Sequence, residues 1–226
     1  MRKGVLLAGG LGTRLRPATL IYNKHLALVY DKPMVCYPLQ ILKDLGCEEI
    51  LLVTGGEHIG GFAEFLGDIY QGMKVTYKVQ TEAGGIAQAL LLAEGFVDSQ
   101  FPVILGDNFF EYLPVIGSYG CALIVKEAPD PERFGVYNGT KILEKPKRPS
   151  SNKAVTGLYF YTPEIFKYIK TLKPSERGEL EITDVNNYCL EKLDAKVFEF
   201  GGFWSDMGTP ESLLRTANFI HDNNKG

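Results

Sequence analysis

Short apolar runs alternate with amphipathic stretches over the first two-thirds of the chain. The apolar runs predict buried strands at residues 4–8, 49–54, 75–79 and 102–105. The stretches between them predict helices at residues 34–45, 59–66 and 86–95. Strands separated by helices of this length imply right-handed crossovers. The pattern therefore predicts α/β architecture with a largely parallel sheet that is covered on both faces.

The order of elements changes in the last third. Further strands are predicted at residues 121–126 and 155–161, and further helices at residues 164–172, 180–193 and 210–222. The Pro-rich, charged stretch at residues 128–152 is typical of loops with short strands rather than of another crossover unit. The sheet is therefore expected to become mixed in this region. The sequence contains no linker and no internal repeat.

Size and charge narrow the class of protein. A chain of 226 residues can bury about 70% of the surface that its unfolded form exposes, which allows a sizeable core. Its 24 basic and 27 acidic residues give a formal net charge of -3. The protein therefore has no general positive field for duplex nucleic acid or an anionic membrane, and local cations must bind any anionic ligand.

The cysteines and the N-terminus favour an intracellular protein. Cys36, Cys47, Cys121 and Cys189 lie far apart, with no CxxC pair and no histidine at metal-site spacing, so reduced, buried thiols are expected. The first apolar run ends in glycines and a cationic segment, unlike a signal peptide. No apolar stretch approaches the ~20 residues that cross a bilayer, and a cytoplasmic location is expected.

A glycine-rich loop, AGGLGTRL at residues 8–15, follows the first predicted strand. Such a loop leaves backbone N–H groups accessible to a phosphate, and Arg14 places a fork of donors beside it. A dinucleotide fingerprint would need a third glycine at Leu15, and a Walker loop would need GK[ST] at Thr13 and Arg14. Neither motif fits. Taken alone, the loop could equally be an ordinary strand-to-helix turn.

The same loop opens a pattern that resembles the sugar nucleotidyltransferases. The segments that carry the resemblance are GGLGTRLRP at 9–17, NKH at 23–25, YDKPM at 30–34, Gln80, GGIAQA at 84–89, GDN at 106–108, RFGV at 133–136, EKP at 144–146, AVTG at 154–157, RGELEITDVN at 177–186 and WSDMGT at 204–209. Ordered agreement over essentially the whole chain is highly specific. Within this family, the segments are most similar to those of enzymes that transfer a thymidylyl group to glucose-1-phosphate.

The resemblance implies a fold and a reaction. The expected fold is α/β, a Rossmann-like nucleotidyltransferase fold with a central mixed, mostly parallel sheet flanked by helices. It forms a single domain over residues 1–226, with a nucleotide-binding part at about 1–125 and a sugar-phosphate-binding part at about 126–226. The expected reaction joins dTTP to glucose-1-phosphate and releases pyrophosphate, with Mg²⁺ as cofactor and neither nucleic acid nor membrane as partner. A homo-oligomer, a dimer or a tetramer, is compatible with the sequence.

Such a reaction brings two polyanions together, so catalysis consists mainly of positioning and charge neutralisation and needs no covalent nucleophile. By resemblance, the backbone of the loop binds the triphosphate through Gly9, Gly10, Gly12 and Thr13. The residues implied to be catalytic are Arg14, Lys24, Asp107 and Lys145. Arg14 neutralises the departing pyrophosphate, and Lys24 lies near the α- and β-phosphates. Outside the pattern, Lys24 would be interpreted as a solvated surface lysine.

Two aspartates are implied to bind the metal. Asp107 directly follows a predicted apolar strand, at the carboxyl end of which α/β proteins build their crevice. The resemblance makes Asp206 the second carboxylate on the same Mg²⁺, which would bridge phosphate oxygens and water. Read locally, either aspartate could instead be the N-cap of a following helix.

The base and the hexose are implied to be bound by separate groups. Gln80 offers a donor and an acceptor to the edge of a pyrimidine, and Gly85 lets the base approach the backbone. The residues implied to bind the sugar phosphate are Gly135, Glu144, Lys145, Val155 and Arg177. Glu144 would accept hydrogen bonds from hexose hydroxyls, and Lys145 with Arg177 would hold the phosphate. If Glu144 and Lys145 both lie on a strand they point to opposite faces, and one of them could then be structural. The segment that contains Arg177 could also be the charged start of a helix.

The sequence also departs from the family. Ala27 and Leu28 stand where the family usually has Leu-Pro, which could shift the loop that carries Lys24. Longer members continue with a helical region that forms a second nucleotide site and part of the subunit contact. The resemblance therefore implies a short form in which feedback inhibition and the oligomer are in doubt. His25 is expected to be a packing or loop residue.

Two other functions remain open. Uridylyl transfer would use the same residues, because uracil and thymine share the edge that Gln80 would read and differ by one methyl group. A non-catalytic sugar-nucleotide sensor would keep the fold. It would not need all five of Arg14, Lys24, Asp107, Lys145 and Asp206, which are all present.

Overall fold

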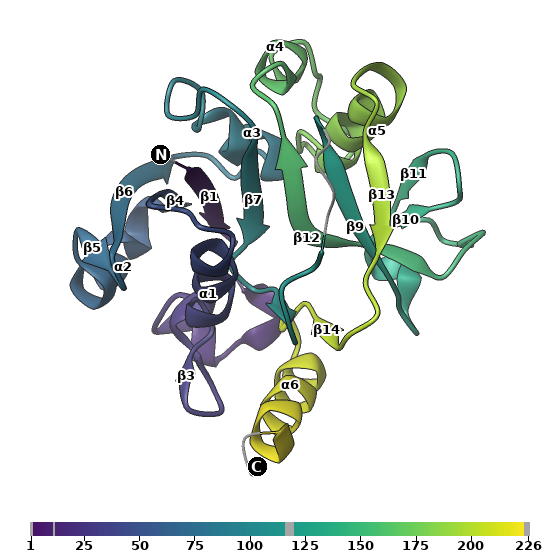
Figure 1. Ribbon diagram of the computed structural model, residues 1–226. Helices are drawn as coiled ribbons and strands as arrows, with labels where there is room; N and C mark the ends of the chain where they lie inside the picture. Colours follow the sequence, from purple (N-terminus) through teal and green to yellow (C-terminus); the bar gives the residue numbers. More distant parts are fainter. Residues whose placement is uncertain (1, 11, 116–119, 224–226) are drawn as a thin grey trace. The chain divides into compact units, whose positions relative to one another are not determined.

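The computed structural model describes residues 2–10, 12–115 and 120–223. They form two compact units (Figure 1), of which unit 1 comprises Met1–Glu82, Ile104–Leu113 and Gly202–Gly226, and unit 2 comprises Ala83–Val103 and Pro114–Gly201. The chain therefore passes between the units several times rather than once near residue 125. The assignment of nucleotide and sugar-phosphate binding to two parts of one domain stays a prediction.

A parallel sheet is the framework of unit 1 (Figure 1). Strands β1 (Lys3–Ala8), β4 (Glu49–Gly55) and β6 (Met73–Gln80) pair in parallel, and β5 (Ile69–Tyr70) is antiparallel to β6. Nearly all residues of β1 and β4 are buried, as expected of strands that are covered on both faces. The register aligns Ala8 with Thr54 and Gly55 with Gln80, so β1, β4 and β6 end at one edge of the sheet.

The remaining elements of unit 1 are helices and short segments. They are η1 (Thr13–Leu15), η2 (Ala18–Leu20), η3 (Lys24–Leu26), β2 (Leu28–Val29), β3 (Lys32–Pro33), α1 (Cys36–Asp44), η4 (Gly56–His58), α2 (Ile59–Leu66), β8 (Phe109–Phe110), β14 (Trp204–Ser205) and α6 (Pro210–Asn223). Thr209 caps α6, since its hydroxyl accepts from the Ser212 backbone N–H at 3.1 Å while the Ser212 hydroxyl accepts from the Thr209 N–H at 3.1 Å.

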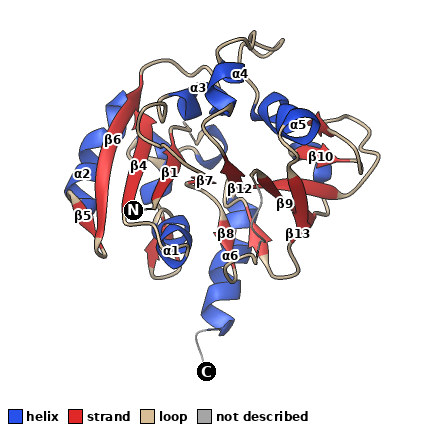
Figure 2. Ribbon diagram, turned by 45° about the horizontal axis from the view of Figure 1, so that its top comes forward, coloured by secondary structure: helices blue, strands red, loops and turns tan. Residues whose placement is uncertain are grey.

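Unit 2 contains a mixed set of strands. Strand β9 (Ala122–Glu127) is antiparallel to β12 (Lys153–Tyr161) and parallel to β13 (Lys196–Glu199). Strand β10 (Gly135–Tyr137) is antiparallel both to β12 and to β11 (Ile142–Glu144). Helix α5 (Ile182–Lys192) contacts β11, and it also contacts α3 (Ile86–Leu91) and α4 (Ile165–Ile169), which are labelled with it in Figure 2. Strand β7 (Phe101–Leu105) leads from unit 2 into unit 1, and η5 (Pro131–Arg133) precedes β10.

The predicted α/β fold with a mixed, mostly parallel sheet flanked by helices is confirmed. The helices predicted at 86–95 and 164–172 are shorter, because each passes into turns after Leu91 and Ile169. Strands β8, β13 and β14 are not predicted, because two to four residues carry too little periodicity to be detected.

The cysteines are free thiols, as expected, but only Cys47, Cys121 and Cys189 are buried. Cys36 is half-buried, and burial raises the pKa of its thiol. Among the helices of the described ranges, none has the length and apolar character that a membrane span requires.

Candidate functional site

The glycine loop begins where β1 ends, at the sheet edge that also carries Gln80. A Cβ atom on Gly9 would lie 2.9 Å from Gln80 Oε1, so a side chain at Gly9 would displace Gln80. Gly12 has φ +62°, and a Cβ there would lie 2.9 Å from Lys24 Cβ. Leu11 lies outside the described residues. The glycines therefore allow the loop to lie close to both Gln80 and Lys24, and a side chain at either glycine would displace one of these residues.

Lys24 and Asp107 form an ion pair beside this loop. Lys24 Nζ lies 2.5 Å from Asp107 Oδ2, and their side chains are only 11% and 16% exposed. Lys24 also lies against Gly10, where a Cβ would be 3.2 Å from Lys24 Cε. Burial alone would raise the pKa of Asp107, but the positive charge of Lys24 and its hydrogen bond hold that pKa below its usual range. Asp107 is therefore ionised beside the loop.

A second side chain orients the Asp107 carboxylate. Asn108 Nδ2 donates to Asp107 Oδ1 at 3.0 Å, and Trp204 Nε1 donates to Asn108 Oδ1 at 2.7 Å. Both oxygens of Asp107 are thus engaged, one by Lys24 and one by Asn108. Sequence reasoning does not identify Asn108 or Trp204 as site residues, since only the fold brings residue 204 to residue 108.

The pairing of β8 with β14 brings the second aspartate to the first. In this antiparallel pair Ser205 is opposite Phe109, so Asp206, the next residue, lies beside the segment that contains Asp107. A Cβ on Gly208 would lie 3.1 Å from Arg14 Nη2 and 3.2 Å from Asp206 Oδ2. The missing side chain at Gly208 therefore leaves room for both Arg14 and Asp206.

One apolar cluster of unit 1 anchors these polar residues. It contains Leu15, Phe109 and Met207, which follow Arg14, Asn108 and Asp206 in the sequence, together with buried Val29, Met34 and Ile220. Because each of these site segments is tied to the cluster by its own buried residue, the cluster holds the polar side chains together without requiring contacts among all of them.

The two aspartates have the chemistry of a Mg²⁺ site. Magnesium prefers oxygen ligands, and protein sites often supply one or two carboxylates while phosphates and water complete the octahedron. No cluster of three or more His, Cys, Asp or Glu side chains suited to a metal occurs in the described parts of the chain. A pair of carboxylates completed by a ligand therefore fits this chain, whereas an all-protein metal cage does not. The local interpretation of the aspartates as N-caps is wrong, because Asp107 precedes β8 and Thr209 caps α6.

Unit 2 contains the residues predicted to bind the hexose phosphate. Glu144 ends β11 and pairs across to Gly135 on β10. Its Oε1 accepts from Arg177 Nη2 at 2.9 Å, and its Oε2 accepts from Thr183 Oγ1 at 2.5 Å. A Cβ on Gly135 would lie 3.1 Å from Thr183 Oγ1. Thr183 is a further site residue that sequence reasoning does not identify.

Lys145 and Glu144 do not point to opposite faces. The strand ends at Glu144, and Lys145 has φ +40°, which turns its side chain back so that Nζ lies 3.6 Å from Glu144 Oε1. Opposite faces are expected only if both residues lie on a strand, and this condition is not met because only Glu144 is on the strand. Val155 is buried on β12, next to Ala154, which pairs with Val136 of β10.

Arg177 is held among carboxylates rather than at the start of a helix. Its Nη2 lies 2.7 Å from Glu181 Oε2 and 3.6 Å from Glu179 Oε2, in addition to its bond with Glu144. Burial lowers the pKa of Arg177, but the bonds to Glu181 outweigh this effect and raise it. Helix α5 begins beyond this segment, at Ile182.

Gly85 has a packing requirement of its own. It precedes α3 with φ +94°, and a Cβ there would lie 2.6 Å from the Leu180 carbonyl oxygen. The Leu180 N–H donates to the Gly84 carbonyl at 2.8 Å, which ties the two segments together.

The structure divides the predicted residues between the units. Unit 1 contains Gly9, Gly10, Gly12, Thr13, Arg14, Lys24, Gln80, Asp107 and Asp206. Unit 2 contains Gly85, Gly135, Glu144, Lys145, Val155 and Arg177. The residues predicted to bind the triphosphate and the metal are thus in one compact unit, and Asp206 belongs to it although it follows the whole of unit 2 in the sequence.

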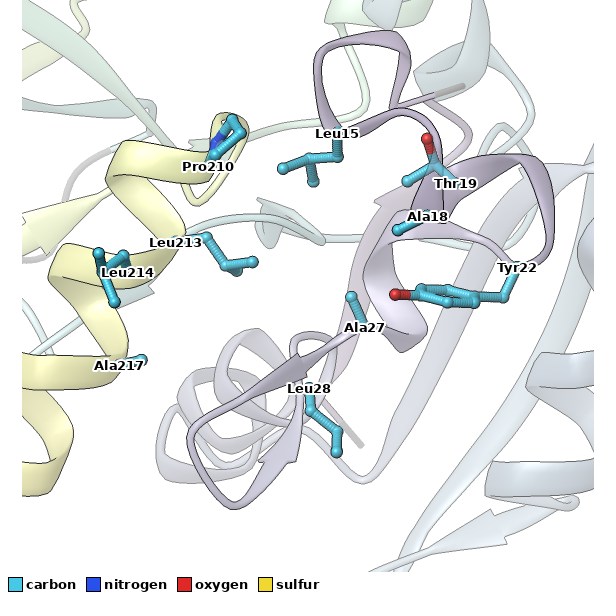
Figure 3. Close-up of a pocket in the computed structure, with 10 residues that line it drawn as sticks. All are labelled: Leu15, Ala18, Thr19, Tyr22, Ala27, Leu28, Pro210, Leu213, Leu214 and Ala217. Atoms are coloured by element: carbon cyan, nitrogen blue, oxygen red, sulfur yellow. The ribbon is translucent and has the colours of Figure 1, made fainter.

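Unit 1 also has an apolar pocket of about 380 Å³ (Figure 3). Helix α6 contributes Leu213, Leu214 and Ala217, and the segment after the glycine loop contributes Tyr22 and Leu28. None of the predicted site residues lines this pocket. Its apolar lining is unsuited to phosphates, so it is distinct from the site built by the loop, Lys24 and Asp107.

Known proteins resemble this chain in sequence and in structure. The family model described as nucleotidyl transferase matches residues 3–223. A glucose-1-phosphate thymidylyltransferase from Neisseria meningitidis is 41% identical over 96% of this chain and 82% of its own length. A structure from Bacillus anthracis, described as a candidate glucose-1-phosphate thymidylyltransferase with bound sucrose, is 44% identical with a TM-score of 0.91, over 100% of this chain and 98% of that one. A UDP-glucose pyrophosphorylase bound to UDP-glucose has a TM-score of 0.86 over 99% of both chains but only 23% identity, and therefore shows the fold alone.

Proposed function

Because the chain belongs to the nucleotidyl transferase family, we propose that it is a magnesium-dependent glucose-1-phosphate thymidylyltransferase. It joins dTTP to α-D-glucose-1-phosphate and yields dTDP-glucose and pyrophosphate. The observation that carries the proposal is the ion pair of Lys24 with Asp107 beside the glycine loop at the end of β1. The relatives that bear this name support the choice of substrates.

The reaction is a displacement at phosphorus. A phosphate oxygen of glucose-1-phosphate forms a bond to the α-phosphorus of dTTP while the bond from that phosphorus to the bridging oxygen breaks, and pyrophosphate leaves with the electron pair. Backbone N–H groups of the loop bind the triphosphate, and Arg14 and Lys24 neutralise the charge that develops on the leaving group. Catalysis by positioning and charge explains why these residues surround the loop and why no nucleophilic side chain is needed.

Asp107 and Asp206 are the proposed Mg²⁺ ligands. When bound, the ion would neutralise phosphate charge, as divalent ions do in phosphoryl and nucleotidyl transfer. Lys24 neutralises Asp107 when no metal is bound, and the triphosphate offers Lys24 an alternative anion. Asn108 keeps its bond to the other Asp107 oxygen throughout, and so preserves the orientation of the carboxylate.

Gln80 is proposed to bind the thymine. It ends β6 at the same sheet edge as the glycine loop, and its side-chain Oε1 would be 2.9 Å from a Cβ on Gly9, which supports a position next to the nucleotide. Thymine and uracil present the same edge to an amide, so one methyl group distinguishes them and gives ~1 kcal/mol of discrimination. Partial use of UTP is therefore expected.

In unit 2, Glu144 is proposed to accept from hexose hydroxyls, and Lys145 with Arg177 to bind the phosphate of the sugar. Gly135 and Val155 line the hexose position. The Nη2 and Nε atoms of Arg177 are engaged by carboxylates, so a phosphate would be bound through its Nη1. We also infer a cytoplasmic location, where free thiols persist.

The test is a panel of nucleotides. The purified protein is incubated with Mg²⁺, glucose-1-phosphate and one of dTTP, UTP, GTP, CTP or ATP, and pyrophosphate release is measured with and without EDTA. We expect release to be fastest with dTTP and to be abolished by EDTA. Preference for UTP would reassign the base and keep the mechanism. Binding of dTTP with no turnover of any hexose-1-phosphate would favour a sensor and contradict the enzyme assignment.

A further inference from the structure

His25 follows Lys24 and is one of the most enclosed polar residues of unit 1. The residue is 2% exposed, and its ring centroid lies 6.4 Å from that of Phe62 on α2. Its own carbonyl accepts from the Val35 N–H at 2.8 Å. The residue is therefore fixed at its backbone and at its ring, although it belongs to a short 3-10 turn that would otherwise be weakly held.

Asn23 determines which ring nitrogen carries the proton. Asn23 Oδ1 accepts from the His25 backbone N–H at 2.9 Å and lies 2.7 Å from His25 Nδ1. Since the backbone N–H can only donate, the atom of Asn23 at this position is the oxygen, and the ring nitrogen that faces it must also donate. The neutral ring is therefore the Nδ1–H tautomer, with Nε2 unprotonated.

The opposite edge of the ring meets the segment that carries Asp107. A Cβ on Gly106 would lie 2.7 Å from His25 Cδ2 and 3.2 Å from Nε2, so the ring is packed on the bare backbone of Gly106. Gly106 is itself fixed, because its N–H donates to the carbonyl of Leu7 in β1 at 2.8 Å. The ring thus lies between the turn that carries Lys24 and the segment that carries Asp107.

We propose that His25 is a positioning residue for the transfer reaction: the Asn23-tethered ring, packed on Gly106, sets the position of Lys24 relative to Asp107. The role rests on the proposed function. Lys24 neighbours the ring in the sequence and Asp107 neighbours Gly106, so a change in the ring or in the glycine moves one charged group against the other. Neither the glycine nor the histidine needs to touch a substrate for this effect.

The proposal predicts that His25 and Gly106 act as one unit. His25→Ala removes the imidazole ring, and Gly106→Ala pushes the ring away from the backbone of residue 106. Each variant should therefore lower kcat by about tenfold to a hundredfold through misplacement of Lys24. In the double variant the added methyl group no longer meets the ring, and the next nearest atom, Ala8 Cβ, is 3.3 Å away. The double variant should therefore be no less active than the worse single variant.

The experiment compares these four proteins for pyrophosphate release from dTTP and glucose-1-phosphate, with melting temperatures as the folding control. We expect kcat to fall and KM for dTTP to rise, with KM for glucose-1-phosphate within twofold of wild type. Multiplicative losses in the double variant, or a folded His25→Ala protein with wild-type kcat and KM for dTTP, would overturn the proposal. An equal rise in KM for both substrates would also overturn it, because such a rise indicates a general structural defect.

A measurement without substrate separates this proposal from the proposed function. Long-range ¹H–¹⁵N NMR of the ring nitrogens, assigned by comparison with His25→Gln, should show His25 protonated at Nδ1 alone, and Gly106→Ala should shift these signals. A ring protonated at Nε2 alone would overturn the placement. If the wild type shows no turnover with any nucleotide, the proposed function fails, and this spectrum still decides whether the ring is held as described.

Discussion

Lys24 and Asp107 are 83 residues apart in the sequence, yet Lys24 Nζ lies 2.5 Å from Asp107 Oδ2 in a part of unit 1 that is largely shielded from water. The pair joins the turn after the glycine loop to the end of β7. A buried ion pair of this kind costs desolvation on both sides, so its geometry must be maintained by its neighbours.

Removal of only one member of the pair should cost more stability than removal of both. Lys24→Met leaves the Asp107 carboxylate buried without its cation and should lower the free energy of unfolding by about 3 kcal/mol. In Lys24→Met with Asp107→Asn no charge is left unpaired, and a substantial part of that loss should return. Urea denaturation without metal measures both values. Additive losses in the double variant would mean that the two groups do not interact as the structure indicates.

Gly9 should be sensitive to the smallest side chain. Gly9→Ala would place a methyl group 2.9 Å from Gln80 Oε1 and so displace the side chain that is proposed to bind the thymine. KM for dTTP should therefore rise about tenfold. Gly60→Ala is the matched control, because no atom lies within 4 Å of the added methyl group and alanine favours the helix that contains it. Steady-state kinetics with dTTP varied distinguish the two. Wild-type KM in Gly9→Ala would argue against close contact between the loop and the nucleotide.

The sequence predicts the parts of the site that have local signals. The glycine loop follows an apolar strand, and Asp107 follows another, so their placement at strand ends can be inferred from hydrophobic runs. The resemblance supplies the residues that have no local signal, such as Asp206. Neither source identifies Thr183 as a partner of Glu144, Trp204 as a partner of Asn108, or His25 as a neighbour of Gly106, because each of these contacts joins distant segments. The hydrogen bond from Asn108 to Asp107 joins adjacent residues, but it has no pattern in the sequence.

The assignment of residues to units also requires the fold. Asp206 follows unit 2 in the sequence and belongs to unit 1, because the two-residue pair of β8 and β14 returns the chain. Gly85 follows Gln80 by only five positions and belongs to unit 2, because its neighbour Gly84 is bonded to Leu180. Neither contact has a periodic pattern from which it could be predicted.

Glu144 should affect the sugar and not the nucleotide. Glu144→Gln keeps the size of the side chain but removes the negative charge of the carboxylate that accepts hydrogen bonds from Arg177 and Thr183. KM for glucose-1-phosphate should therefore rise about tenfold or more. KM for dTTP should stay within twofold, because the residues predicted to bind the triphosphate are in unit 1. Lys153→Gln, which breaks an exposed ion pair with Glu199, is a control for loss of one charge in the same unit. Equal effects on both substrates would contradict the assignment of Glu144 to the hexose.

His25 should make the protein less stable in mild acid. Burial, and then the charge of Lys24, lower the pKa of His25 from 6.5 to about 3. Between these two values the unfolded chain binds a proton that the folded protein does not, so the free energy of unfolding falls as the pH falls. From pH 7 to pH 5 the loss attributable to this one residue is about 2 kcal/mol.

Comparison of wild type with His25→Gln isolates that contribution. Glutamine does not titrate, so the variant should lose about 2 kcal/mol less than wild type between pH 7 and pH 5 in urea denaturation with EDTA present. His221→Gln is the matched control, since it makes the same substitution at a histidine of α6 whose side chain is 43% exposed. Parallel losses in wild type and His25→Gln would show that His25 accepts a proton in the folded protein as readily as in the unfolded chain. The ring would then not be enclosed against Gly106 as the structure describes.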